Sequence, residues 1–412
     1  MNTLDIIALE QQYVLQTYRR APFVLVRGEG VRVFDNEGRE YLDGMAGIAV
    51  NALGHNDPQV VAALRAAADG LIHVSNLFHT EPQVLLARSL VKSSFADRVF
   101  FCNSGTEAVE GALKFARKYA RHAFPQRGPT SGEDKTRIVA FAGSFHGRTM
   151  GALSATATEK YRTPFEPLIP GVRFAPFNDP VAAEESITDD VCAVIVEPVQ
   201  GEGGVHLATP NFLECVRAAC DRTGALLICD EVQCGLGRTG HLWAYQAYGI
   251  TPDLMALAKP LAAGLPMGAV LMTQAVADVL APGDHGSTFA AGPLVCRVAQ
   301  VVLDRISAPD FLAEVHTKGQ HLAARLSELV AASPLACEAR GMGLMWGIEC
   351  EVDAAAIVAA GYRHSLLVCS AGPKVVRLLP PLTITLAELD ELVDRLAAAF
   401  ADVEKEAESG EQ

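Results

Sequence analysis

The chain has 412 residues, of which half are apolar and a fifth are charged, a composition typical of globular proteins. One hydrophobic core rarely organises so long a chain, so at least two domains are expected. The formal net charge of −14 argues against a nucleic-acid partner and against binding to an anionic membrane surface. The ten cysteines include no pair or cluster with zinc-ligand spacing, and we expect no metal site.

Residues 1–57 are expected to form a segment that packs with a small C-terminal domain. They contain VLVRGEGVRVFDNEGREYLD, in which turn residues at 28–30 and 36–38 separate hairpin-like strands. The beginning of the chain carries acids and lacks a basic-then-apolar signal pattern. The sequence has no run of about 18 apolar residues, which a membrane helix needs. We therefore expect a cytoplasmic protein without a membrane span.

Residues 58–300 alternate short apolar runs with helix-period segments, which predicts a large α/β domain with a mainly parallel central sheet. The predicted strands, all expected to be buried on both faces, are 98–102, 137–141, 191–198, 225–230, 254–259 and 268–272. The predicted helices between them include 58–71, 107–120 and 211–222.

Residues 301–412 differ in pattern. A long helix over 311–332 is followed by the short strands GLMWGIEC, LLVCS and VVRLLP and by a final helix from about residue 386. This order predicts a smaller α+β domain.

The stretch CGLGRTG (234–240) fits the dinucleotide fingerprint G-x-G-x-x-G. A dinucleotide loop needs a strand that ends at the first glycine, a helix that starts near the third, and an acid at the end of the next strand. Here the apolar run ALLICD ends at Asp230, aromatic residues, a glycine and Pro252 follow Gly240, and Asp253 precedes its apolar run. We therefore predict that these glycines do not hold a nicotinamide cofactor.

Asp230 and Lys259 end two successive apolar runs, ALLICD and LMALAK. Taken alone, a strand-end aspartate caps a turn and a strand-end lysine reaches solvent. Together at one sheet edge they fit pyridoxal phosphate. A desolvated lysine is a nucleophile that can form an imine with the aldehyde, and a carboxylate can keep the ring nitrogen protonated.

A phosphate site is predicted at FCNSGTEAVEGALKFARKYA. Ser104 and Glu107 have the spacing of a capping box. The backbone N–H groups of Gly105 and Thr106 at this helix N-terminus would bind an anion. The alternative is an ordinary capped helix, and the shared sheet edge with Asp230 and Lys259 favours the phosphate.

These residues resemble the class III (ornithine-type) aminotransferases of fold type I, and among them most closely the acetylornithine aminotransferases. The resemblance covers nearly the whole chain. Its motifs are NSGTEA (103–108), SFHGRT (144–149), EPVQGEGG (197–204), CDEVQCGLGRTG (229–240), PDLMALAK (252–259), HGSTF (285–289) and VVRLLPPLTIT (375–385).

The resemblance implies a role for each residue of a site that binds pyridoxal 5′-phosphate. Lys259 and Asp230 would be the catalytic pair. The implied cofactor contacts are Ser104, Gly105 and Thr106 at the phosphate, Phe145 on the ring face, Gln233 at the ring hydroxyl and Thr288 at the phosphate of the other subunit of a homodimer. The implied substrate contacts are Arg148 and Arg377, one for each carboxylate of glutamate, and Glu202, which would pair with Arg377 when the amine substrate is bound.

The reaction implied is transfer of the terminal amino group of N-acetylornithine to 2-oxoglutarate, in arginine biosynthesis. The alternatives are the lysine-pathway enzyme on carrier-linked aminoadipate semialdehyde, the aminotransferases of ornithine, succinylornithine or 4-aminobutyrate, and an aminomutase that uses the same cofactor. Ornithine enzymes commonly carry a tyrosine near the stretch that here reads GIA (47–49). The chain also departs from the family at AAGP (290–293) and PLAAG (260–264), where glycines are commoner.

Overall fold

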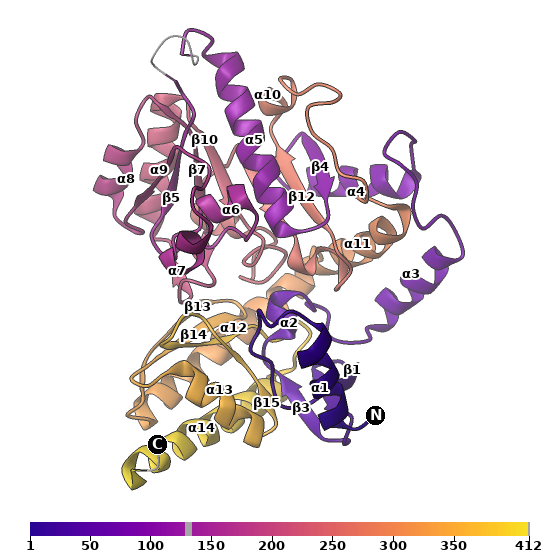
Figure 1. The fold of residues 1–412 in the computed structure, drawn as a ribbon, viewed down its shortest axis with the longest axis vertical. Helices are drawn as coiled ribbons and strands as arrows, with labels where there is room; N and C mark the ends of the chain where they lie inside the picture. Colours follow the sequence, from indigo (N-terminus) through magenta and orange to yellow (C-terminus); the bar gives the residue numbers. More distant parts are fainter. Residues whose placement is uncertain (128–133, 411–412) are drawn as a thin grey trace.

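The computed structural model describes residues 1–127 and 134–410. Figure 1 shows two parts, an upper one built around a large sheet and a lower one that contains both chain ends. Among the helices of the described residues, none is both long enough and apolar enough to cross a bilayer.

The large sheet has seven strands in the order β4-β12-β11-β10-β7-β5-β6. Their bounds are β4 (Arg98–Cys102), β5 (Arg137–Phe141), β6 (Val172–Ala175), β7 (Val191–Val196), β10 (Leu226–Asp230), β11 (Leu254–Leu257) and β12 (Gly268–Met272). The pairs from β11 to β6 are parallel, whereas β12 is antiparallel to both of its neighbours, β11 and β4. The predicted mainly parallel sheet is confirmed, with one reversed strand.

Helices cover both faces of this sheet, which is why its central strands are apolar except at Asp230, the last residue of β10. Every residue of β7, β10, β11 and β12 is buried. Along β7, Val194 belongs to the core cluster that contains the buried face of α9, and Ile195 belongs to the one that contains α5. The helices of this part are α3 (Pro58–Ala68), α4 (Glu81–Lys92), α5 (Gly105–Ala123), α6 (Met150–Ser154), α7 (Glu159–Arg162), α8 (Pro180–Ser186), α9 (Pro210–Thr223), α10 (Gln274–Ala277) and α11 (Pro293–Ile306). The short elements are β8 (Val199–Gln200), β9 (His206–Leu207) and the 3-10 turns η1 (Thr163–Phe165), η2 (Ala244–Tyr248) and η3 (Lys259–Ala262).

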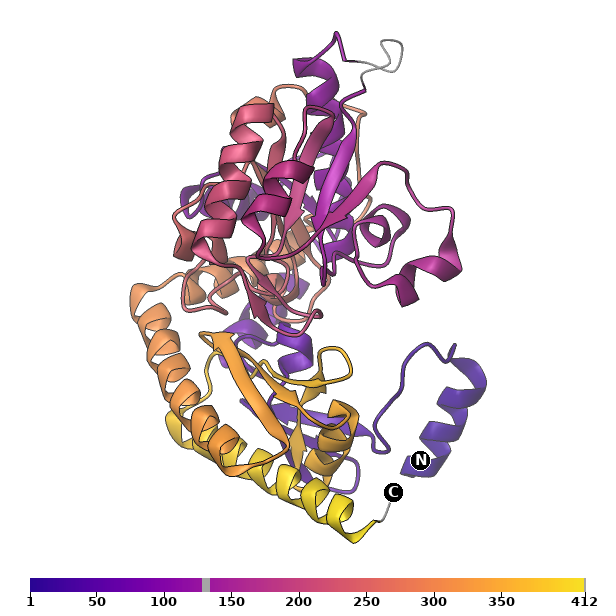
Figure 2. The same ribbon diagram turned by 90° about the vertical axis from the view of Figure 1, so that its left-hand side faces the viewer.

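The lower part combines segments from both chain ends. One sheet has the order β1-β2-β3-β15, in which Leu42 of β3 pairs in parallel with Leu366 of β15, and the other has the antiparallel order β13-β14-β17-β16. Figure 2 shows the long helices α12 and α14 along the outside of this part. Its early elements are α1 (Thr3–Tyr13), β1 (Leu25–Glu29), β2 (Arg32–Asp35), β3 (Glu40–Asp43) and α2 (Ala46–Ala49). Its late elements are α12 (Pro309–Ala332), β13 (Ala336–Met342), β14 (Met345–Cys350), α13 (Ala354–Arg363), β15 (Leu366–Leu367), β16 (Cys369–Ser370), β17 (Val375–Leu378) and α14 (Leu386–Ser409).

We propose that the chain divides into an N-terminal segment, 1–57, a large domain, 58–300, and a small domain, 301–412, to which the N-terminal segment belongs. The boundary near residue 300 lies inside α11, which packs against α3 and α4.

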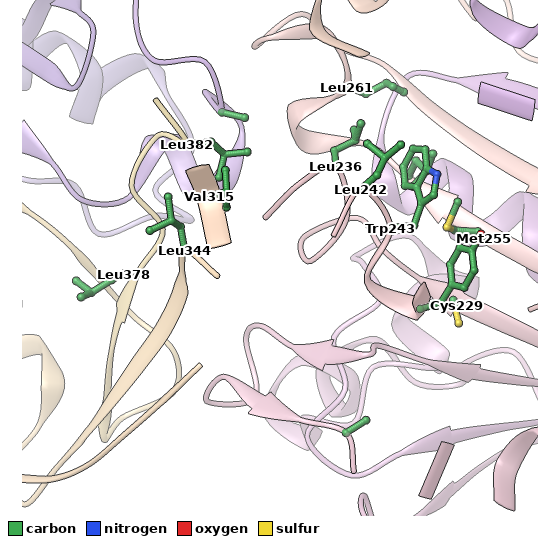
Figure 3. Close-up of a cluster of buried hydrophobic side chains, with 14 of the residues drawn as sticks. Cys229, Leu236, Leu242, Trp243, Met255, Leu261, Val315, Leu344, Leu378 and Leu382 are labelled. Carbon is green, nitrogen blue, oxygen red and sulfur yellow. The ribbon is translucent and has the colours of Figure 1, made fainter. Parts of the chain in front are cut away.

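The loop that leaves β10 joins the two parts. Leu236, Leu242 and Trp243 of this loop share one buried cluster with Val315, Leu344, Leu378 and Leu382 of the C-terminal segment, and Figure 3 shows these side chains. Arg238, which is 2% exposed, donates to the carbonyl oxygens of Leu344 at 3.0 Å and Pro380 at 2.6 Å. The fingerprint-like glycines therefore lie in a loop that packs against the small domain, and the element after Gly240 is the 3-10 turn η2 rather than an α-helix.

Candidate active site

A cavity of about 420 Å³ lies at the carboxyl ends of the parallel strands. This is the edge at which open α/β sheets bind ligands. The predicted site residues that line the cavity are Ser104, Gly105, Thr106, Phe145, Arg148, Glu202, Asp230, Gln233 and Lys259. They follow the ends of β4, β5, β7, β10 and β11, so sheet topology brings together segments that are far apart in sequence.

Lys259 reaches the cavity from a strained turn. Asp230 pairs in register with Ala256 of β11, so the strands that carry the two predicted catalytic residues are adjacent. The prediction that Lys259 ends a strand is wrong, because β11 ends at Leu257 and Lys259 begins η3 with a φ of +33°. Burial lowers the pKa of Lys259 from 10.5 to about 8. Much more neutral, nucleophilic amine is therefore available near neutral pH than an ordinary lysine provides.

Asp230 is 4% exposed and is held by two hydrogen bonds. His146 Nδ1–H donates to Oδ2 at 2.7 Å, and the backbone N–H of Val232 donates to Oδ1 at 3.0 Å. His146 is itself 3% exposed, and its Nε2 has no hydrogen-bond partner within the described part of the chain. These hydrogen bonds fix the orientation of the Asp230 carboxyl group at the cavity.

Glu197, just beyond the end of β7, is a second buried carboxyl group at the cavity. It accepts from the backbone N–H of Phe145 at 2.8 Å and from that of Gly201 at 3.0 Å. Burial raises its pKa to about 7, an effect that His146 opposes and the charge of Asp230 reinforces. Glu197 thereby connects the loop of Phe145 with the loop of Glu202.

Neither His146 nor Glu197 was singled out by the sequence analysis, although both lie in the quoted motifs SFHGRT and EPVQGEGG. The signal that could have found them is their place after two buried strands that are neighbours in the sheet: Glu197 comes directly after β7, and His146 lies in the loop that follows β5.

The N-terminus of α5 faces the same cavity. Ser104 is its N-cap and accepts from the N–H of Glu107 at 3.3 Å, as predicted. The capping box also predicts that the Glu107 carboxylate accepts from the backbone N–H of Ser104. This part of the prediction is wrong, because the carboxylate accepts from the backbone N–H of Asn103 at 2.5 Å. A Cβ on Gly105 would lie 2.7 Å from Cγ1 of Val232, so only glycine fits where this helix meets the loop after β10. The arrangement suits a phosphate group, since the free N–H groups at the N-terminus of a 19-residue helix can bind an anion.

Arg377, on β17 of the small domain, is 1% exposed and reaches the site through two neighbours. Its Nη1–H donates to Glu202 at 2.6 Å and to the amide oxygen of Gln233 at 3.0 Å. Burial opposes the charged form of Arg377, but the adjacent Cys369 and Glu202 raise its pKa, and Arg377 in turn lowers the pKa of Glu202 against the effect of burial. The predicted pairing of Glu202 with Arg377 is thus present in the structure.

Arg148 and Thr288 are the two exposed members of the predicted set. Arg148 lines the cavity, and its guanidinium carbon lies 3.6 Å from the centre of the Tyr161 ring. Thr288 does not line the cavity. It follows Ser287, whose hydroxyl accepts from the amide of Asn103 at 2.8 Å, so the HGSTF segment is attached beside the N-terminus of α5.

Both departures from the family pattern place alanine in left-handed backbone. Ala263, after η3, has a φ of +49°, and Ala291 has a φ of +54°. Glycine adopts this conformation at no steric cost, whereas alanine is strained in it.

The family model described as Aminotransferase class-III matches residues 13–400, and the chain belongs to this family. The protein is therefore an aminotransferase, and its cofactor is pyridoxal phosphate, which the residues around the cavity fit. The chain is 51% identical, over 95% of its own length and 86% of the relative's, to a mitochondrial acetylornithine aminotransferase of Alnus glutinosa. It is 46% identical, over 95% of each chain, to a succinylornithine transaminase of Yersinia pseudotuberculosis. A structure of the ornithine aminotransferase from Toxoplasma gondii, with partial occupancy of PLP at its active site, matches with a TM-score of 0.94 at 34% identity, over 99% of this chain and 96% of that one.

Proposed function

We propose that the protein transfers the terminal amino group of N-acetylornithine to 2-oxoglutarate and so forms N-acetylglutamate semialdehyde and glutamate, a step of arginine biosynthesis. The observation that carries this proposal is a pair of arginines in different states: Arg148 lines the cavity and is free of any ion pair within the described residues, whereas Arg377 lies behind the lining residue Glu202 and is held by it. Two carboxylates of glutamate require two cations, whereas the amine substrate needs only one of them. The identity to acetylornithine aminotransferase supports the choice of substrate.

The roles of the individual residues are part of the proposal. Pyridoxal phosphate supplies an aldehyde that binds amines and a ring that accepts electrons. Asp230 would hold a proton on the ring nitrogen, and Lys259 would move a proton at the substrate carbon that bears the amino group. Ser104, Gly105 and Thr106 would bind the phosphate, while Phe145 and Gln233 would position the ring.

Arg377 and Glu202 would let one cavity accept both substrates. When the amine substrate is bound, Glu202 neutralises Arg377 and no ligand carboxylate is needed there. When glutamate is bound, its second carboxylate replaces Glu202 on the guanidinium. Arg148 would bind the carboxylate that both substrates share.

We also propose that the active unit is a cytoplasmic homodimer in which Thr288 reaches the phosphate of the other subunit. The exposure of Thr288 on a loop anchored beside α5 supports this. Sedimentation at assay concentration should give twice the chain mass, and a monomer with full activity would contradict the role of Thr288.

N-Succinylornithine is the second candidate substrate, because a succinylornithine transaminase is 46% identical to this chain. Ornithine, 4-aminobutyrate and the carrier-linked lysine precursor remain further alternatives. The decisive experiment compares kcat/KM for these amines with 2-oxoglutarate as acceptor. We expect N-acetylornithine to give the highest kcat/KM. A higher value for another amine would make that amine the assigned substrate in its place. Repeated turnover without 2-oxoglutarate would indicate an aminomutase, because an aminotransferase converts only one equivalent of amine per cofactor before it needs the acceptor.

The cofactor role of Lys259 has a separate test. The purified protein should absorb visible light through its bound cofactor and keep this absorption during dialysis. Lys259→Ala should lose the cofactor on dialysis, and retention equal to that of the wild type would remove Lys259 from its proposed role.

A further inference from the structure

Arg148 stands at the cavity without an acidic partner. It follows β5, two residues before α6, and its side chain is exposed. Within the described residues, no carboxylate oxygen lies within ion-pair distance of its guanidinium. A free arginine side chain loses rotamer freedom when a ligand fixes it, so its affinity for a carboxylate depends on what restrains it beforehand.

Two aromatic rings restrain Arg148. The guanidinium carbon lies 3.6 Å from the centre of the Tyr161 ring and 5.4 Å from that of the Phe145 ring. The rings stand nearly perpendicular, at an interplanar angle of 88° and a centroid distance of 6.4 Å. A guanidinium that lies over an aromatic ring can keep its N–H groups available for a carboxylate.

Tyr161 is itself held in place through its helix. It lies on α7, and the next residue, Arg162, stacks over Phe174 of β6 with its guanidinium carbon 4.5 Å from the ring centre. The edge strand of the large sheet thereby fixes α7, and α7 fixes the ring beneath Arg148.

We propose that Tyr161 is a positioning residue that holds Arg148 ready for the substrate carboxylate. This inference rests on the proposed function, in which Arg148 binds the carboxylate common to both substrates. Tyr161 should therefore influence the affinity for both substrates by the same factor, whereas Arg377 should act mainly on glutamate.

The test measures binding of glutarate, a dicarboxylate without an amino group to transfer, to the holoenzyme by titration calorimetry. A cation–π contact at a partly exposed site contributes about 0.5–1 kcal/mol, so Tyr161→Leu should weaken glutarate binding about two- to fivefold. Tyr161→Phe keeps the ring and should keep the wild-type affinity. Lys160→Ala, an exposed change on the same helix, should leave the affinity unchanged and controls for disturbance of α7.

A double-mutant cycle separates positioning from general disruption. In the Arg148→Ala background, Tyr161→Leu should have no further effect on glutarate affinity. The proposal would be overturned if the losses of glutarate affinity in the two single variants added up in the double variant. It would also be overturned if Arg148→Ala weakened glutarate binding while Tyr161→Leu kept the wild-type affinity. Wild-type affinity in Arg148→Ala would instead remove Arg148 from the proposed function and this inference with it.

Discussion

His146 and Asp230 form a buried hydrogen-bonded pair in which the Nδ1–H of the histidine lies 2.7 Å from Oδ2 of the carboxylate. His146 comes from the loop after β5 and Asp230 from the end of β10, with β7 between these strands in the sheet. The backbone N–H of His146 donates to Thr156 Oγ1 at 2.9 Å, which fixes the histidine in turn. The carboxylate proposed to meet the cofactor ring is thus oriented by a buried histidine that is itself held by a hydrogen bond.

Replacing His146 by alanine should loosen cofactor binding. Loss of a hydrogen bond to a charged group costs at least about 1.5 kcal/mol, which corresponds to about a tenfold increase in the Kd for pyridoxal phosphate. Equilibrium dialysis of the apoprotein measures this directly. His146→Asn retains an N–H near the Nδ1 position and should bind more tightly than the alanine variant; equal Kd values for wild type and both variants would contradict the role of the pair.

The lowered pKa of Lys259 predicts a pH dependence of apoprotein stability. The folded apoprotein binds fewer protons than the unfolded chain between the folded pKa of about 8 and the ordinary value of 10.5. The free energy of unfolding should therefore rise with pH in this window. Below the window it should be lowered by the full cost of desolvating the charged lysine. In urea titrations, the stability deficit of the wild type relative to Lys259→Met should shrink as pH rises from about 8 to 10.5, and a difference that stays constant over this window would show that the pKa of the lysine is not lowered.

Arg377→Ala should impair one half-reaction more than the other. Hydrogen bonds to charged groups contribute about 1.5–3 kcal/mol. The specificity constant of the half-reaction with glutamate should therefore fall about 10- to 150-fold more than that of the half-reaction with N-acetylornithine. Single-turnover spectra follow each half-reaction separately. Arg148→Ala serves as the comparison, because it should slow both by similar factors, and equal losses in Arg377→Ala would speak against a glutamate-specific role.

Ala263→Gly should stabilise the protein. Alanine in the left-handed region is strained by about 1–2 kcal/mol, and the greater freedom of glycine in the unfolded chain offsets part of the gain, so we expect about 0.5–1 kcal/mol. Ala262→Gly is the matched control, since Ala262 is buried in η3 without a positive φ and should lose stability. Thermal unfolding of both variants would decide, and a lower Tm for Ala263→Gly would contradict the argument.

Much of the sheet could be predicted because its strands are short apolar runs bounded by turn residues. β4, β5 and β12 have the predicted bounds. The reversed direction of β12 could not be predicted, because a strand that is buried on both faces reads the same in either direction. Periodicity also could not show that β11 stops before Lys259, since the apolar run LMALAK continues past the last paired residue.

The candidate site was predicted where its residues end a strand or begin a helix. Asp230 and Ser104 have such positions, and the resemblance supplied the residues that have no local signal, such as Arg377 and Glu202. His146 and Glu197 are different, because what they do depends on which neighbours the sheet places beside them. Glu107 shows the same limit, since spacing predicted the correct helix end but not that its carboxylate bonds Asn103.

Arg238 has a consequence for how the protein can move. Its guanidinium is buried between carbonyl oxygens of the small domain, and burial lowers its pKa to about 9 although Asp43 weakly opposes this. A rotation of the small domain away from the loop after β10 would break both hydrogen bonds and expose the apolar side chains that the two parts bury together, which is energetically costly. We therefore expect the two domains to stay docked while substrates exchange, so that entry and release depend on side chains at the cavity mouth rather than on hinge opening.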